Sequence, residues 1–274
     1  MDMKEAEEKL LAVIQDIAEG RYSNDIMEFT KDGFPEPMRR VAEAMGMMMV
    51  KVEAREFHLE QLIEQLRELN ERIKQNTIKV VSSLAQALAA RDKYTEGHTT
   101  RVGELSRELA TRLGLSEDEA DGVYIGGQLH DIGKIGFSDL LFLDHSKKNS
   151  PEMVKEIIRH PDMGADILQD LDFLGSSIDY VRCHHERIDG SGYPRHLDEK
   201  DIPLGAQIIG IADGFDAMTT DRPYQKARTY EEALDILRNL GGKKFRSELV
   251  EAFARLIEDR SRAEESAKTA EHKK

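Results

Sequence analysis

Two neighbouring imidazoles, His184 and His185, open the segment HHERIDGSGYP, which ends on Tyr193 and Pro194. Few structural roles need two adjacent histidines, whereas neutral imidazole is the commonest protein ligand for transition metals. The glycines that follow indicate a turn, and Pro194 favours an extended backbone at Tyr193. The segment therefore predicts a metal site that is bordered by a turn.

Further side chains of the metal-ligating kind are spread along the chain: His98, His130, Asp131, His160 and Asp213. Asp213 lies in the apolar run IIGIADGFDAM, where an ionised aspartate is normally paired or bound to a cation. Together with the histidine pair, the set comprises five imidazoles and two carboxylates, which is more than one tetrahedral ion takes. We therefore expect two ions that share a bridging carboxylate.

The order of these motifs resembles the HD phosphohydrolase superfamily. With His160, the histidine pair and Gly192-Tyr193-Pro194, the chain resembles the HD-GYP family of cyclic di-GMP phosphodiesterases. The resemblance runs over about residues 92–250 through the segments RDKYTEGHTTRV, LHDIGKIG, RHPDMGADIL, HHERIDGSGYP, DIPLGAQIIGIADGFDAMTTDRPY and LVEAF. An isolated HD dipeptide arises by chance, whereas this ordered set is highly specific.

The resemblance implies a catalytic metal centre with two groups of ligands. The ligands that it implies for one ion are His98, His130, Asp131 and Asp213. Asp131 would bridge to a second ion, whose other ligands would be His160, His184 and His185. A hydroxide between the ions would attack phosphorus in line, giving linear pGpG and, after a second cut, GMP. Imidazole and carboxylate do not decide between iron and manganese, but the resemblance favours these redox-active ions over zinc.

The resemblance also implies roles for side chains around the metals. Lys134 in HDxGK would place its ammonium over the phosphate or the leaving oxygen, as a catalytic and substrate-binding group. Arg222 in TTDRPY would bind phosphate through paired donors, and Tyr193 would contact a guanine or its phosphate. Thr95 and Arg101 would orient the helix of His98. The side chains expected to orient the imidazoles and brace the turn are Glu186, Arg187 and Asp189.

Some positions depart from the family pattern. Tyr94 stands where three-metal members carry a glutamate, which predicts a two-metal site. Gln225 replaces a residue that is often basic, and Phe245-Arg246-Ser247 replaces the usual Phe-Asp-Pro. These departures predict weaker or altered nucleotide binding. The alternative function is a catalytically slow or inactive cyclic-dinucleotide sensor or protein-docking scaffold that keeps the metal site. Hydrolysis of a mixed cyclic dinucleotide or of another phosphoester is a further alternative.

The composition constrains partners and location. Acidic residues number 53 against 39 basic, giving a formal net charge of -14, which disfavours nucleic acid polymers and anionic membranes as partners. No apolar run approaches the roughly 20 residues that cross a bilayer, and the charged start MDMKEAEEKL is unlike a signal peptide. We expect a cytoplasmic protein. The single cysteine, Cys183, excludes an internal disulfide and is expected to pack in the interior.

Few aromatic residues and abundant Leu, Ala, Glu and Arg predict an all-α protein. We expect a HAMP-like helical module or simple helical hairpin over 1–55, a coiled-coil linker helix over 56–82, a helical HD-type catalytic domain over 83–260 and a tail over 261–274. Within the catalytic domain, Ser116 and Glu119 predict a capping box. Separate helices are expected over 151–160 and 164–170, and a further helix around 128–131 carries the HD dipeptide.

A heptad pattern marks the predicted linker: Leu59, Leu62, Leu66, Leu69, Ile73, Asn76 and Val80. Such a seam forms left-handed two-stranded coiled coils, and a polar Asn76 within it can fix the register. The pattern therefore predicts a parallel homodimer. A surface helix packed against its own domain is the alternative, but the charged residues that flank the seam favour self-association.

Overall fold

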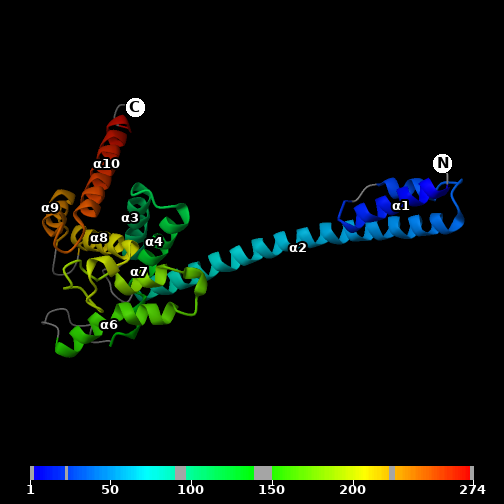
Figure 1. Cartoon of the computed structure of the whole chain (residues 1–274). Coiled ribbons are helices and arrows are strands. Elements are labelled where there is room, and N and C mark those ends of the chain that lie inside the picture. Colours follow the sequence, from blue (N-terminus) through cyan, green and yellow to red (C-terminus); the bar gives the residue numbers. More distant parts are fainter. Residues whose placement is uncertain (1–2, 22–23, 90–96, 139–149, 222–225, 272–274) are drawn as a thin grey trace. The chain divides into compact units, whose positions relative to one another are not determined.

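The helix-forming composition produces helices throughout the computed structural model, which describes residues 3–21, 24–89, 97–138, 150–221 and 226–271. Regular strands are absent from these ranges, so the prediction of an all-α protein is confirmed. The chain divides into two units, residues 1–73 and 74–274 (Figure 1). None of the helices in the described ranges is long and apolar enough to cross a membrane.

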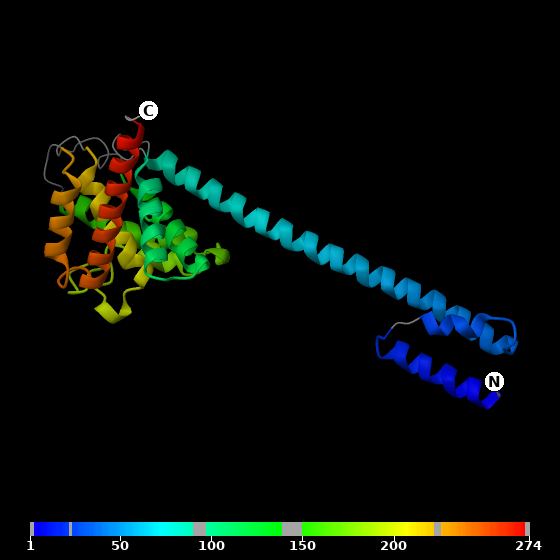
Figure 2. The ribbon, with the colours of Figure 1, turned by 90° about the horizontal axis from the view of Figure 1, so that it is seen from above.

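The first unit consists of two helices and a connector, the order that the sequence predicts. α1 (Met3–Ala18) and the start of α2 (Glu36–Ala89) run in the same direction in both views, and η1 (Asn24–Thr30) leads back between their ends (Figures 1 and 2). Apolar residues at helical spacing on α1 are buried against the other two elements. The buried residues are Leu10, Val13, Ile17, Ile26, Phe29, Ala42 and Met49. The resemblance to a HAMP module stays a prediction.

α2 is one continuous helix of 54 residues. It carries the predicted heptad, whose apolar members are solvent-exposed over 39–64% of their surface: Leu59, Leu62, Leu66, Leu69, Ile73 and Val80. Its last turns behave differently, because Ile78, Val81 and Ala85 pack into an apolar cluster of the second unit. The seam is thus a row of leucines that the described part of its own chain leaves open to solvent.

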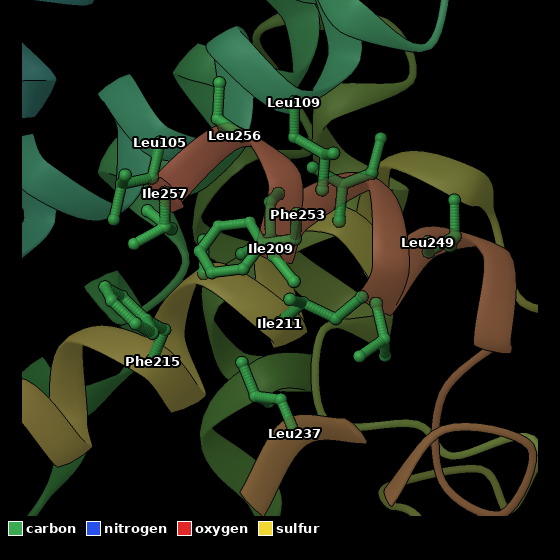
Figure 3. Packing of buried hydrophobic residues seen from close by; sticks show 14 of the residues in the cluster. Leu105, Leu109, Ile209, Ile211, Phe215, Leu237, Leu249, Phe253, Leu256 and Ile257 are labelled. Carbon is green, nitrogen blue, oxygen red and sulfur yellow. The ribbon is translucent and has the colours of Figure 1, made fainter. Parts of the chain in front are cut away.

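The second unit is built around α8 (Leu204–Thr219), which is apolar on nearly all sides and is therefore buried. The other helices of this unit are α3 (His98–Arg112), α4 (Glu117–Leu129), α6 (Pro151–Leu168), α7 (Ser177–Cys183), α9 (Tyr230–Leu240) and α10 (Ser247–Glu271). Short turns of helix lie between them: η2 (Ile132–Gly136), η3 (Asp172–Leu174) and η4 (Glu199–Asp201). Figure 3 shows how side chains of α3, α8, α9 and α10 interdigitate around Phe253.

The helix boundaries that the sequence predicts for the second unit are confirmed only in part. The capping box is confirmed, because the amide of Glu119 donates to Ser116 Oγ and the amide of Ser116 donates to Glu119 Oε2. The two helices predicted over 151–170 are a single helix, α6, with Pro161 inside it. The helix expected to carry the HD dipeptide ends at Leu129 instead, and a separate 3-10 turn follows at Ile132.

We expect Phe253→Ala to lower the free energy of unfolding by about 3–5 kcal/mol, because a fully buried aromatic ring is lost and a cavity remains. Ile167→Ala, on the surface of α6, is the control and should cost about 0.5 kcal/mol or less. Urea denaturation followed by circular dichroism measures both. Equal losses for the two variants would contradict the placement of this core.

Candidate metal centre

The seven predicted ligands come together in the second unit, although they are far apart along the chain. Their positions are His98 at the start of α3, His130 and Asp131 directly after α4, His160 inside α6, His184 and His185 directly after α7, and Asp213 inside α8. Most of the imidazoles are buried, so protein rather than bulk water surrounds them. Helix ends supply most of these positions, and the buried α8 supplies the last one.

Three of the side chains form a first group: His98, His130 and Asp131 have ligand atoms that all lie within 4.8 Å of one another. Asp213 borders this group, with its Oδ1 3.4 Å from Nε2 of His98 and 3.9 Å from Nε2 of His130. Two imidazoles and two carboxylates therefore face a common point. This is a mixed nitrogen and oxygen donor set of the kind that iron, manganese and zinc accept.

A second group consists of imidazoles only: ligand atoms of His160, His184 and His185 also lie within 4.8 Å of one another. Asp131 lies between the groups. Its Oδ2 is 3.3 Å from Nε2 of His130, and its Oδ1 is 3.4 Å from Nε2 of His160. The two oxygens of one carboxylate thus face different groups, as a bridging carboxylate requires.

Backbone carbonyls determine which nitrogen of three imidazoles is free. Nδ1 of His130 lies 2.7 Å from the carbonyl oxygen of Gly127, and Nδ1 of His184 lies 2.6 Å from that of Val181. Nδ1 of His160 lies 2.6 Å from a backbone carbonyl oxygen of its own helix, α6. A carbonyl oxygen can only accept, so each Nδ1 carries the proton, and a neutral ring then keeps its lone pair on Nε2.

The free Nε2 atoms face one another in the interior. Burial lowers the pKa of both His160 and His184, so these rings are neutral, and their Nε2 atoms lie only 3.4 Å apart. Nε2 of His130 is buried and has no hydrogen-bond partner within the described residues. Lone pairs at this separation repel unless a cation lies between them, and buried polar atoms rarely stay unpaired. The donor set therefore fits metal ions.

Both carboxylates of the centre are ionised. Burial acts to raise the pKa of Asp131, but favourable electrostatic interactions with neighbouring side chains, His130 and Lys134 first, outweigh it and hold that pKa well below its usual range. Burial likewise acts to raise the pKa of Asp213, and the hydrogen bond from His98 outweighs it. Two buried negative charges are thus available to compensate a cation.

His98 is oriented by a carboxylate instead of a carbonyl. Its Nδ1 lies 2.7 Å from Oδ2 of Asp216, which Arg101 also holds through Nη2 at 3.0 Å. Burial acts to lower the pKa of His98, but hydrogen bonds with Asp213 and Asp216 outweigh it and raise the pKa to about 9. Arg101 therefore acts on the helix of His98 as the sequence predicts, through a partner that the sequence analysis missed. The spacing of Asp213 and Asp216, one turn apart on α8, was the available signal.

Glycines allow the backbone approaches that bring the groups together. A Cβ on Gly133, in η2, would lie 2.0 Å from the carbonyl oxygen of His160 and 2.6 Å from the amide nitrogen of Gly164. No side chain fits such a space, so η2 packs directly on the backbone of α6. This contact carries Asp131, the residue before η2, to His160.

The turn after the histidine pair is braced by the three residues predicted for that role. Glu186 is buried and accepts hydrogen bonds from the amides of Arg195 and Leu197. Arg187 donates to the carbonyl of His184 and lies 4.7 Å from the ring centre of Phe245. Asp189 pairs with Lys244 and with Ser191. These contacts fix the backbone that positions the imidazoles, while the imidazole nitrogens themselves use other partners.

The residues predicted to bind substrate are only partly placed. Tyr193 stacks on His185, with ring centres 4.6 Å apart. The ammonium of Lys134, on η2, contacts the carboxylate of Asp131, and the Lys134 side chain is 32% exposed. Lys134 is therefore next to the centre, but on a different element from the helix that ends before His130. Arg222, Tyr94, Thr95 and Gln225 lie outside the described residues.

Comparisons with known proteins agree with this geometry. The family model of the HD domain matches residues 82–249. The chain is similar to a cyclic di-GMP phosphodiesterase of Thermotoga maritima, with 40% identity over 168 residues, 61% of this chain and 45% of that protein. It is also similar to the cyclic di-GMP phosphodiesterase response regulator RpfG of Xanthomonas campestris pv. campestris, with 36% identity over 212 residues, 74% of this chain and 53% of that protein.

The fold also has a counterpart among solved structures. A cyclic GMP-AMP specific phosphodiesterase of Vibrio cholerae superposes with a TM-score of 0.54 at 23% identity, over 66% of this chain and 48% of that one. The likeness concerns the fold. The chain spans about half the length of the two curated relatives, 45% and 53%.

We expect Asp216→Asn to weaken binding of the ion at the first group about tenfold, because outer partners of metal-bound histidines contribute on that scale. The substitution keeps the shape of the side chain but removes the charge that orients His98. Titration with Mn²⁺ against a competing chelator measures the effect. Asp121→Asn, which breaks a surface ion pair with Arg107, is the control, and an equal loss in both variants would contradict the role of Asp216.

Proposed function

The chain belongs to the HD domain family, and we propose that it is a metal-dependent phosphodiesterase that hydrolyses cyclic di-GMP to linear pGpG, GMP or both. The resemblance that the order of motifs indicated is thereby confirmed at the level of the family. The observation that carries the proposal is the convergence of the buried, deprotonated Nε2 atoms of His130 and His160 on either side of Asp131. The names of the two curated relatives support the choice of substrate.

We propose two ions, iron or manganese, with Asp131 as the bridge. The first would be held by His98, His130, Asp131 and Asp213, and the second by Asp131, His160, His184 and His185. When bound, such a pair supplies an activated water and neutralises charge on the phosphate. The protein supplies the fixed orientation of four of the five imidazoles, since the Nδ1 atoms of His98, His130, His160 and His184 are already held by carbonyls or a carboxylate.

Three residues are proposed to handle the nucleotide. Lys134 is next to Asp131 and exposed enough to reach a phosphate, where its ammonium would stabilise charge on the leaving oxygen. Tyr193 would contact a guanine or phosphate while its ring supports His185. Arg222 would bind phosphate through paired donors. Action in the cytoplasm remains a prediction of the composition.

We expect protein purified without oxygen and reloaded with Fe²⁺ or Mn²⁺ to bind two ions per chain and to hydrolyse cyclic di-GMP. Asp131→Asn should lower kcat by about 10²-fold or more, because both groups lose their shared charge. Asp172→Asn, an exposed position in η3, is the control. Chromatography of the products and elemental analysis of the protein measure both quantities.

Several results of this experiment would contradict the proposal. Three tightly held ions per chain would contradict the two-metal site. Binding of cyclic di-GMP without turnover would favour the sensor or scaffold function over the enzyme function. Faster hydrolysis of a mixed cyclic dinucleotide than of cyclic di-GMP would show that the mixed dinucleotide is the preferred substrate.

We propose further that α2 forms a parallel coiled coil with a second copy of the chain. The support is the combination of an unbroken helix, a heptad seam and the exposure of its leucines. Burying such a row removes several hundred Å² of apolar surface from water in a two-stranded coil, a gain of roughly 25 cal/mol per Å². Asn76 in the seam would favour one register and the parallel orientation.

Replacing Leu62 and Leu66 together by glutamate should convert the dimer to a monomer, because the new charges would face each other across the seam. Sedimentation equilibrium at micromolar concentration measures the mass. Arg67→Glu, an exposed residue beside the seam, is the control and should leave the dimer intact. A monomeric parent protein at the same concentration would refute the coiled coil.

A further inference from the structure

α6 contains a proline where a straight helix would place a backbone donor. Pro161 has no N–H, and in an α-helix that N–H would bond to the carbonyl oxygen four residues earlier, which belongs to Ile157. Nδ1 of His160 lies 2.6 Å from this same oxygen. The carbonyl oxygen of Ile157 therefore lacks its usual amide donor and accepts a hydrogen bond from the imidazole of His160 instead.

The other two carbonyl-bound imidazoles use acceptors that helix ends release. α4 ends at Leu129, so the carbonyl of Gly127 lies in the last turn, and it accepts from Nδ1 of His130. α7 ends at Cys183, and the carbonyl of Val181 in its last turn accepts from Nδ1 of His184. The last four carbonyls of a helix have no amide partner within it. Each Nδ1 thus meets an oxygen that has no amide partner within its own helix.

His160 requires a different solution, because α6 cannot end there. The helix continues through Gly164, whose backbone packs against η2 so closely that a Cβ on Gly133 would lie 2.6 Å from the Gly164 amide nitrogen and 2.0 Å from the His160 carbonyl oxygen. Ending the helix at His160 would remove this surface and separate Asp131 from the second group. A proline releases the carbonyl and lets the helix continue.

We propose that Pro161 is a positioning residue for the second metal ion. By leaving the Ile157 carbonyl to Nδ1, it holds His160 in the tautomer whose Nε2 lone pair faces Asp131 and His184, 3.4 Å from each. This inference rests on the proposed two-metal function and adds a residue to it. An amide at position 161 would compete with the imidazole for the oxygen and let the ring turn.

The test compares Pro161→Ala with Pro151→Ala. Pro151 is the first residue of the same helix, where an amide has no helical carbonyl to meet, so this control removes a proline without touching the acceptor of His160. Zn²⁺ is titrated into each metal-free protein against a chromophoric chelator. Thermal unfolding is recorded in parallel, because a proline inside a helix is destabilising and its removal should not lower the midpoint.

In Pro161→Ala we expect the second ion to bind about tenfold more weakly, the first ion to bind as before, and the unfolding midpoint to stay or rise. Histidine ¹⁵N NMR of the metal-free variant should show His160 gaining the tautomer with the proton on Nε2. Pro151→Ala should match the parent protein in both measurements. A merely structural role for Pro161 would leave the tautomer unchanged.

Equal affinity for the second ion in Pro161→Ala and the parent protein would overturn the inference, and so would weaker binding without a change of tautomer. Should the variant fail to fold, the parent protein still decides: its metal-free His160 must carry the proton on Nδ1, and a proton on Nε2 refutes the inference. The proposed function fails on different grounds, namely when the parent protein neither binds two ions nor hydrolyses cyclic di-GMP.

Discussion

Imidazole lone pairs that face each other in the protein interior are the constraint on which the rest of the second unit depends. Nε2 of His160 and Nε2 of His184 are 3.4 Å apart, and each ring is committed to donating from Nδ1. Without a cation the two lone pairs repel each other, and this repulsion lowers the stability of the folded chain. Helix ends, close backbone contacts and the buried α8 all hold these nitrogen atoms in positions from which they can bind a cation.

The helices achieve this through backbone groups more than through long side chains. Carbonyls at the ends of α4 and α7 hold two rings, and an interior carbonyl of α6 holds a third. His98 depends instead on a charged side chain, Asp216, which Arg101 in turn fixes. Backbone acceptors cannot rotate away or change their protonation, so the donor atoms are set before any ion binds.

Much of this centre was predictable from the sequence, because ligand identity is a matter of residue type and order. His98, His130, His160, the histidine pair and both aspartates meet as expected. The ring orientations were not predictable, since they depend on where helices end and on which carbonyls are released. Pro161 illustrates the limit: proline suggests a helix boundary, yet packing against η2 keeps α6 continuous. Asp216 carried a spacing signal, but its partner His98 is 118 residues away.

The last turns of α2 have a mechanical consequence for the HD dipeptide. Ala85 packs with Leu129 and Ile132, the residues that bracket His130 and Asp131, and Ser82 donates to Gln128 across the same contact. The contact therefore supports the backbone on both sides of the dipeptide, and loosening it would loosen the placement of His130 and Asp131.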